Sequence, residues 1–212
     1  MKKIVVISGG GHAKVVISIL RKLKEYQIIG YTDIEDKGKI FDVSYLGDDE
    51  EFLKENENIK YAAIGIGQIK QYKLRKKIIE NYLINGFDFP VIISPDAIVN
   101  EQVEVGKGTV VMDGVVINTG TKIGEFCIIN TKSSIDHECY IGDYIHIAPG
   151  TTLSGTVEIH DNTLIGVGST IMQGKTIGKN CIVGAASVIT KSFDDNLLIC
   201  GNPAKVIKII DQ

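Results

Sequence analysis

An aliphatic residue recurs at every sixth position over a long stretch of this chain, and that spacing restricts the fold more than any other feature. The series runs without a break through Val99, Val105, Val111, Ile117, Ile123, Ile129, Ile135, Ile141, Ile147, Leu153, Ile159, Ile165, Ile171, Ile177, Val183 and Ile189. An α-helix repeats its apolar positions every three or four residues and a half-buried strand every two, so neither explains a period of six. Three short strands that close one triangular coil do explain it, and the pattern predicts the hexapeptide form of the parallel β-helix.

Small residues two positions before the aliphatic ones support this fold. They are Ala97, Thr109, Thr121, Cys127, Ser133, Cys139, Thr151, Thr163, Ser169, Cys181 and Ser187. A large and a small side chain would then point inward on each strand. Glycine follows the aliphatic residue at several corners, where the backbone needs room or a positive φ.

The residues before this series show a different pattern, in which apolar strands alternate with amphipathic helices. The expected strands are Ile4–Ile7, Ile28–Tyr31, Tyr61–Ile66 and Phe87–Ile93, and the expected helices run to about Lys24, over Asp48–Asn56 and over about Ile69–Leu83. Such alternation predicts a parallel sheet. We therefore expect two domains: a small Rossmann-like α/β domain over 1–93 and a β-helix over 94–212, whose last apolar residues, up to Ile210, cover the final coil.

Composition narrows the classes of function. A net charge of −3 argues against a nucleic-acid partner, and the lysines and arginine between Lys70 and Lys77 lie at helical spacing, as on a solvated helix face. The apolar run Ile4–Ile7 is too short for a signal peptide or a membrane span, so we expect a cytoplasmic protein without a membrane partner. The four cysteines form no C-x-x-C pair, which favours reduced core residues and no metal site.

A glycine turn opens the first helix. In Gly9-Gly10-Gly11-His12, bare backbone amides at a helix N-terminus could attract a phosphate, and Asp33 follows the second strand where dinucleotide folds hold a ribose hydroxyl. Lys14 occupies the position that a G-x-G-x-x-G motif gives to its third glycine, so NAD is disfavoured. Either a nucleotide-phosphate site or a plain tight turn fits this segment.

Two histidines lie in the middle of the repeats, His137 and His146, nine residues or half a coil apart. His137 is flanked by Asp136 and Glu138, and a carboxylate beside an imidazole can orient the ring and stabilise its protonated form. This pattern fits a general base, although a surface histidine without a catalytic role would look the same.

Outward apolar positions on the coils favour self-association. Val110, Val116, Ile128 and Ile182 would face away from the core, and a face of this kind needs cover. A homotrimer with threefold symmetry is the expected assembly.

Several of these segments together resemble a known family. The repeats, Gly9-Gly10-Gly11-His12-Ala13, Ser134-Ile135-Asp136-His137-Glu138-Cys139 and Gly201-Asn202-Pro203-Ala204 are similar to the left-handed β-helix sugar acetyltransferases. These include the sialic acid O-acetyltransferase type and the nucleotide-amino-sugar N-acetyltransferases of bacillosamine and perosamine pathways. The resemblance implies a trimer that binds acetyl-CoA between neighbouring β-helices, with the nucleotide sugar held by the α/β domain.

Roles for single residues follow from the resemblance alone. His137 is similar to the general base and Glu138 to its polarising partner. The residues similar to acetyl-CoA contacts are His146, Gly155, Val167 and Ala185; of these, the Gly155 amide would bind the thioester carbonyl. The residues similar to sugar-nucleotide contacts are Gly11, His12, Asp33, Gly65 and Gly67.

The leading hypothesis is acetyl transfer from acetyl-CoA to the amino group of a nucleotide-linked amino sugar, with a UDP-4-amino sugar as the expected acceptor. O-acetylation of sialic acid or its CMP form is the close alternative, because amine and hydroxyl acceptors need the same base. A non-catalytic solenoid is the third possibility. A carbonic-anhydrase-like zinc site would need a third histidine at suitable spacing beside His137 and His146.

Overall fold

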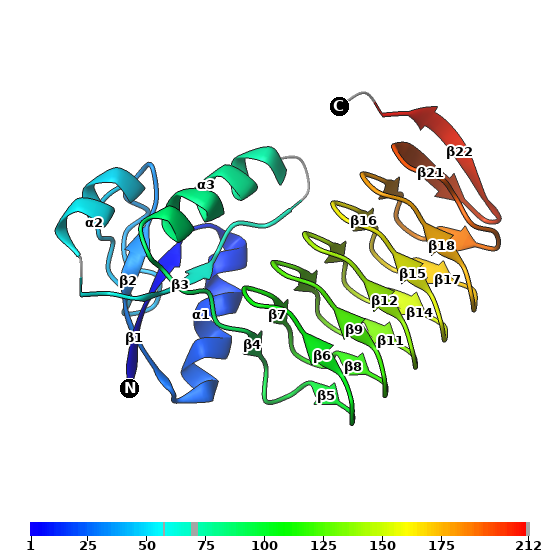
Figure 1. The fold of residues 1–212 in the computed structure, drawn as a ribbon. Coiled ribbons are helices and arrows are strands. Elements are labelled where there is room, and N and C mark those ends of the chain that lie inside the picture. The colour runs from blue at the N-terminus through cyan, green and yellow to red at the C-terminus, as the bar shows by residue number, and fades with distance from the viewer. Residues whose placement is uncertain (57, 69–71, 211–212) are drawn as a thin grey trace. The chain divides into compact units, whose positions relative to one another are not determined.

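The computed structural model describes residues 1–56, 58–68 and 72–210 of the chain (Figure 1). The chain forms two compact units, Met1–Ser94 and Pro95–Gln212, each with its own core. Within the described ranges, the helices are all too short or too polar to cross a membrane.

The first unit is a small parallel α/β structure. Its sheet has the order β2-β1-β3, formed by β1 (Lys2–Ile7), β2 (Tyr26–Thr32) and β3 (Tyr61–Ile64). The helices are α1 (Gly11–Leu23), α2 (Asp49–Glu55) and α3 (Tyr72–Ile84), so the first three residues of the expected third helix lie outside the described part. The expected Rossmann-like alternation is confirmed. The core of this first unit includes the fully buried aromatic side chains of Tyr31, Phe52 and Tyr82.

The expected strand Phe87–Ile93 is mostly wrong. Asp88 forms a single bridge with Tyr61, and the only strand in this segment of the described chain is β4 (Ile92–Ile93). Pro90 lies between the two, and proline has no N–H to donate to a sheet. Phe87 and Phe89 still contribute apolar side chains to the core.

The second unit is the expected left-handed parallel β-helix (Figure 1). Its two-residue strands are β5 (Ile98–Val99), β6 (Glu104–Val105), β7 (Val110–Val111), β8 (Val116–Ile117), β9 (Lys122–Ile123), β10 (Ile128–Ile129), β11 (Ser134–Ile135), β12 (Tyr140–Ile141), β13 (His146–Ile147), β14 (Thr152–Leu153), β15 (Glu158–Ile159), β16 (Leu164–Ile165), β17 (Thr170–Ile171), β18 (Thr176–Ile177), β19 (Ile182–Val183) and β20 (Val188–Ile189). Each pairs in parallel with the strand one coil away, as Ile129 does with Ile147 and Ile135 with Leu153. One coil therefore spans 18 residues.

Three sheets form the sides of the β-helix, which has the shape of a triangular prism. We call them by their central strands: the β13 sheet (β19-β16-β13-β10-β7), the β14 sheet (β20-β17-β14-β11-β8-β5) and the β12 sheet (β18-β15-β12-β9-β6). The sixfold aliphatic residues fill the interior, and from Val111 to Ile189 each is at most 4% exposed. The small inward residues pack beside them, and their hydroxyls are satisfied by corner carbonyls, as in Thr163 Oγ1 donating to Gly178 O at 2.8 Å.

The outward faces carry less apolar surface than the sequence suggested. Val110 and Ile128, expected to need a second copy for cover, are already 1% and 0% exposed in the single chain. Only Val116 and Ile182 of that group are half-buried. Apolar burial at these positions therefore gives weaker support for a trimer than we expected.

The end of the chain also differs from expectation. Strand β21 (Leu197–Gly201) continues the β13 sheet, and β22 (Ala204–Ile209) pairs with it in antiparallel fashion after a turn at Asn202-Pro203. The side chains of Val206, Ile207 and Ile209 are 48%, 59% and 71% exposed. They extend a sheet and do not cover the last coil.

Candidate functional site

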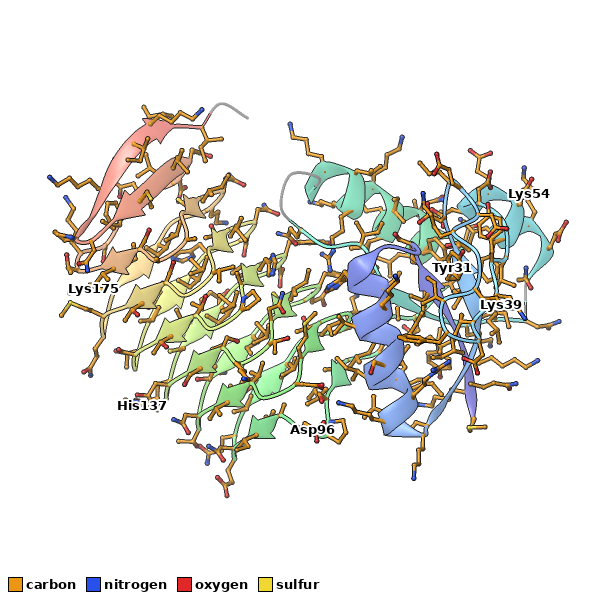
Figure 2. All side chains as sticks on the ribbon, turned by 180° about the vertical axis from the view of Figure 1, so that it is seen from behind. Tyr31, Lys39, Lys54, Asp96, His137 and Lys175 are labelled. Carbon is orange, nitrogen blue, oxygen red and sulfur yellow. The ribbon has the colours of Figure 1, made fainter. Side chains whose placement is uncertain are left out.

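His137 lies at the corner between β11 and β12, where the chain leaves the β14 sheet and enters the β12 sheet. We call this the histidine corner, residues 136–138 with Gly155 one coil later. Figure 2 shows His137 at the outer edge of the β-helix. The turn depends on Glu138, whose φ of 56° is in the left-handed region. Both flanks of the corner are fixed by strand pairing, which places His137 on a rigid support.

The two edges of the His137 ring have different surroundings. Nδ1 lies 3.2 Å from Glu138 Oε2, a distance that fits an Nδ1–H donating to the carboxylate and leaves Nε2 as the proton acceptor. The other edge faces Gly155: a Cβ placed on that glycine would lie 2.5 Å from Nε2. The His137 and Glu138 side chains are 44% and 69% exposed, so the pair is open to a ligand. The structure thus brings together His137, Glu138 and Gly155.

The backbone of the corner is held by neighbouring coils. Thr156 N donates to His137 O at 2.9 Å, and Gly174 N donates to Gly155 O at 3.1 Å. Neither bond uses the Gly155 N–H. Asp136 Oδ1 accepts hydrogen bonds from Asn118 Nδ2 and from His137 N, both at 2.9 Å, and these two bonds lower the pKa of the Asp136 carboxyl.

His146 lies away from the histidine corner of its own chain. It stands on β13, in the β13 sheet, and is 7% exposed. Its Nε2 is 3.1 Å from Asn130 Nδ2. Asn130, which also accepts a hydrogen bond from Thr131 N through Oδ1, was missed by sequence reasoning because only the fold brings it beside His146.

Val167 and Ala185 share another corner, between the β13 and β14 sheets. Both are exposed, and they lie one coil apart, with Ala186 N donating to Val167 O at 2.8 Å. This corner and the histidine corner lie at opposite strand ends of the β14 sheet: one precedes β17 and the other follows β11. Within one chain the structure therefore separates two of the expected acetyl-CoA contacts from His137.

In the first unit, the glycine turn joins the end of β1 to α1. Gly10 is the N-cap residue of α1, and no side chain caps the first turn, which also carries no acidic residue. A Cβ on Gly11 would meet no atom of the described part of the chain within 4 Å, so the backbone is open to approach from those residues. Such a helix N-terminus favours an anion.

Asp33 contacts the glycine turn directly. Its Oδ2 accepts hydrogen bonds from Gly9 N at 2.8 Å and from Ser8 Oγ at 3.2 Å. Asp33 therefore holds the turn in place, a role that its position at the end of β2 did not reveal. It also lines a cavity of about 150 Å³, whose walls are Ile7, Ser8, Thr32, Asp33, Ile34, Asp49, Ile66, Leu74 and Ile78.

The expected pocket residues Gly65 and Gly67 do not line this cavity. Gly65 is buried, and a Cβ there would lie 2.6 Å from Ile7 O and 2.7 Å from Ala13 Cβ, so the glycine permits close packing of β1, β3 and α1. Gly67 lies beside His12, with 3.9 Å between a Cβ on the glycine and the His12 Cβ. Gly11 and His12 are also outside the cavity wall.

A buried cluster that the sequence did not indicate supports the cavity. Asp49 Oδ1 accepts hydrogen bonds from Thr32 Oγ1 and Tyr82 OH, both at 2.7 Å. Burial and the nearby Asp49 charge raise the pKa of Tyr82. The polar wall of the cavity thus consists of hydroxyls and two carboxylates, a surface suited to a ligand group that donates hydrogen bonds.

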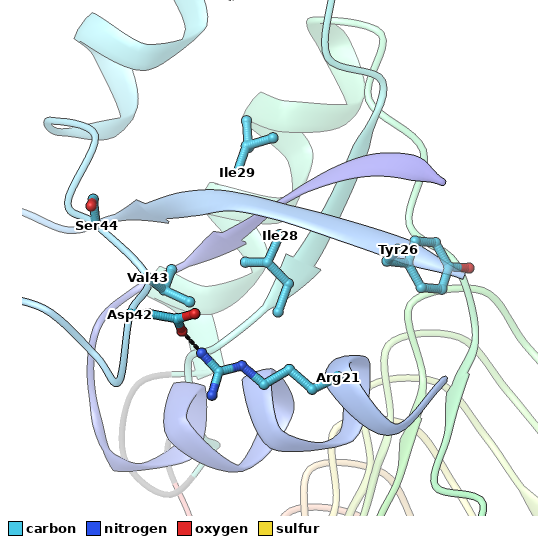
Figure 3. A pocket seen from close by; sticks show the side chains of 7 residues that line it. All are labelled: Arg21, Tyr26, Ile28, Ile29, Asp42, Val43 and Ser44. Carbon is cyan, nitrogen blue, oxygen red and sulfur yellow. Dashed lines mark ion pairs between the residues drawn. The ribbon is translucent and has the colours of Figure 1, made fainter. Parts of the chain in front are cut away.

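A second cavity of about 230 Å³ lies between α1, β2 and residues 42–44 (Figure 3). Its one cationic side chain, Arg21, forms an ion pair with Asp42 across it. The charge is therefore compensated, and none of the residues predicted from the sequence lines this cavity.

The described residues include no group of three or more histidine, cysteine, aspartate or glutamate side chains placed to hold a metal ion. The three cysteines at inward positions, Cys127, Cys139 and Cys181, are buried free thiols. Burial raises the pKa of the Cys139 and Cys181 thiols, as expected for core residues.

Comparison with known proteins identifies both units. The model of the PglD N-terminal domain matches residues 3–82, and the model of the bacterial transferase hexapeptide (six repeats) matches residues 156–191. GDP-perosamine N-acetyltransferase of Escherichia coli O157:H7 is 31% identical over 163 residues, which cover 74% of this chain and 72% of that protein.

Solved structures are similar over almost the whole chain. A point mutant of perosamine N-acetyltransferase from Caulobacter crescentus, in complex with CoA and GDP-perosamine, is 34% identical with a TM-score of 0.91, covering 98% of each chain. The acetyltransferase domain of PglB from Neisseria gonorrhoeae FA1090, in complex with acetyl coenzyme A, is 32% identical with a TM-score of 0.91, covering 97% of this chain and 99% of that one.

Proposed function

The chain belongs to the family of sugar N-acetyltransferases that join a PglD N-terminal domain to hexapeptide repeats, and from this premise we propose that it acetylates the amino group of a nucleotide-linked amino sugar through His137. As a member of that family it is an acetyl-CoA-dependent enzyme. The observation that carries the residue assignment is the histidine corner, where Glu138 faces Nδ1 and Gly155 stands beside Nε2.

The proposed reaction is direct acetyl transfer. The neutral amine attacks the thioester carbon of acetyl-CoA while His137 Nε2 takes the proton that the nitrogen loses. The Gly155 N–H donates to the oxyanion of the tetrahedral intermediate. The carbon–sulfur bond then breaks, and the CoA thiolate accepts the proton from the imidazolium. Glu138 stabilises that imidazolium in the meantime.

The glycine turn supports a nucleotide on the acceptor. The first turn of α1, which has no side-chain cap, would bind a phosphate. The cavity beside Asp33 and Asp49 has a wall that accepts hydrogen bonds, which suits a base or sugar, and its carboxylates repel phosphate. His12 and Gly67, which lie side by side, are proposed contacts of the same ligand. Gly65 is assigned to packing instead.

The donor would lie along exposed corners of the β-helix. Val167 and Ala185 are proposed contacts of the CoA arm, and because the β14 sheet separates them from His137 within one chain, we propose that the two corners of one site come from two subunits. This geometry favours the proposed homotrimer. His146, nearly buried and bonded to Asn130, is proposed to act near the thioester through that pair.

The acceptor is tested by incubating the protein with acetyl-CoA and a panel of acceptors, measuring free CoA thiol and the mass of the product. We predict turnover with a UDP-4-amino sugar, and GDP-perosamine, which a related structure binds, is the second acceptor in the panel. Turnover of sialic acid or CMP-sialic acid alone would favour O-acetylation. No turnover with any of the four would contradict the proposal.

The base is tested by His137→Ala. We expect kcat to fall about 10²-fold or more, the usual effect of losing a general base, with an unchanged melting temperature because the half-exposed ring contributes little to the core. His160→Ala is the matched control: it too is a histidine beside a carboxylate, with Glu158 at 3.8 Å, but on another corner. Equal losses in the two variants would remove His137 from its role.

A further inference from the structure

A ladder of polar side chains runs along the β-helix to the histidine corner. Asn100 Nδ2 donates to Asn118 Oδ1 at 2.7 Å, and Asn118 Nδ2 donates to Asp136 Oδ1 at 2.9 Å. The three residues are spaced by one coil, and the backbone pairing of β5, β8 and β11 keeps them in register. The same Asp136 oxygen accepts the hydrogen bond from His137 N.

The change from amide to carboxylate along this ladder has a chemical consequence. An asparagine side chain both donates and accepts, so Asn118 can pass the ladder on to the next coil. An ionised aspartate only accepts, so Asp136 takes two donors, from Asn118 and from the His137 backbone, and ends the ladder there. Its lowered pKa keeps it in that form at neutral pH.

The histidine needs such an anchor because its side-chain partner is weakly held. Glu138 is 69% exposed, and an exposed ion pair of this kind contributes little to holding a ring in one orientation. The backbone of His137 is instead fixed on both sides, by Asp136 at N and by Thr156 N at O. Fixing the backbone sets the direction of the Cα–Cβ bond, and this limits the positions that Nε2 can reach by rotation about χ1 and χ2.

Resting on the function proposed above, we propose that Asp136 is a positioning residue for the acetyl transfer: held by the Asn100–Asn118 ladder, it fixes the His137 backbone so that Nε2 stands beside Gly155. Asp136 does not touch the acceptor or the thioester. It acts through the orientation of the base.

The test compares Asp136→Ala with Asp136→Asn. Alanine removes the acceptor oxygen, and we expect kcat to fall about 10- to 100-fold, the scale of a small misplacement of a catalytic group, with the KM for acetyl-CoA within about twofold of wild type. Asparagine keeps an acceptor oxygen and should restore kcat to within about threefold of wild type. If the asparagine variant falls as far as the alanine variant, or if neither falls, the positioning role is wrong.

Asp143→Ala is the matched control. Asp143 Oδ1 also accepts a hydrogen bond from a backbone N–H, that of Glu125 at 2.7 Å, at a corner that carries no histidine. Its kcat should be unchanged, and a loss equal to that of Asp136→Ala would show a general effect on the β-helix. Asn118→Ala is the substitute variant if Asp136→Ala does not fold. It removes the hydrogen bond from Asn118 to Asp136 but leaves the one from His137 N, so the loss of kcat should be smaller than for Asp136→Ala. An unchanged kcat in Asn118→Ala would contradict the role of the ladder.

A spectroscopic measurement separates this inference from the proposed function. In the ¹⁵N-histidine NMR spectrum of the free protein, we expect His137 as the Nδ1–H tautomer in wild type and Asp136→Asn, and a mixture of tautomers in Asp136→Ala. This result needs no acceptor. An enzyme without turnover on the panel would overturn the proposed function alone, and identical His137 signals in all three proteins would overturn the role of Asp136.

Discussion

At the scale of single residues, the 18-residue coil explains why a glycine stands beside His137. His137 and Gly155 are one coil apart, and the ring occupies the space that a side chain at 155 would need. The family resemblance assigns Gly155 only a backbone N–H, a group that every residue but proline supplies. The structure adds a reason for glycine itself.

We predict that Gly155→Ala lowers kcat by about 10-fold or more although it keeps the backbone amide, because the new methyl group displaces the ring from its working position. The melting temperature should change little, since the ring can turn toward solvent. In a His137→Ala background the same substitution should have almost no further effect on the residual rate, as expected for two groups that act as a unit. Steady-state kinetics of wild type, the two single variants and the double variant test this prediction. Losses of kcat that add up in the double variant would contradict a shared role of the two residues.

The sequence supported the prediction of His137 with Glu138 because the two are adjacent, whereas Gly155, one coil later, was predicted from the family resemblance alone. It could not reveal Asn130 or Asp49. Their partners, His146 and Tyr82, lie 16 and 33 residues away in sequence, and no repeat or motif relates the members of either pair. Contacts of this kind depend on how the corners and helices pack, which a period does not encode.

At the scale of elements, the periodicity of the sequence correctly predicted the repeated strands, but the predictions for the segments directly before and after the repeats were wrong. The β-helix strands follow directly from the sixfold spacing. The apolar residues of Phe87–Ile93 indicate a strand, but Pro90 within this segment has no N–H to donate to a sheet. The final strand β22 was expected to cover a coil, but its sequence does not show that antiparallel pairing with β21 leaves Val206 and Ile207 exposed.

Two glycines near the end of β3 give a stability prediction at this scale. Gly65→Ala should lower the free energy of unfolding by about 1–3 kcal/mol, since a methyl group there meets Ile7 O and Ala13 Cβ at distances that force β1 and α1 apart. Gly67→Ala should be almost neutral, because among the described residues the nearest neighbour of a Cβ at this position is 3.9 Å away. Thermal unfolding of both variants and wild type gives the comparison, and equal destabilisation would contradict the packing role of Gly65.

At the scale of the whole molecule, the arrangement of corners bears on how many subunits a site needs. The exposed pair Val167 and Ala185 and the histidine corner lie on opposite edges of the β14 sheet. A donor that touches both corners of one chain would have to cross the whole width of that sheet. In a ring of identical subunits, one chain can supply the histidine corner and its neighbour the other corner.

Complementation between inactive variants tests this arrangement. Val167→Trp should block the CoA path by bulk on an exposed corner, and its activity alone should fall at least about 10-fold, as His137→Ala does. When the two variants carry different tags, are co-expressed and are tandem-purified, one of the three sites in each mixed trimer joins an intact histidine corner to an intact Val167 corner, so activity should return to about a third of wild type. If each site belonged to one chain, every site would carry one of the two defects and no activity would return. Sedimentation of the tandem-purified material gives the number of subunits in the same sample, and a monomer there would contradict the shared site directly.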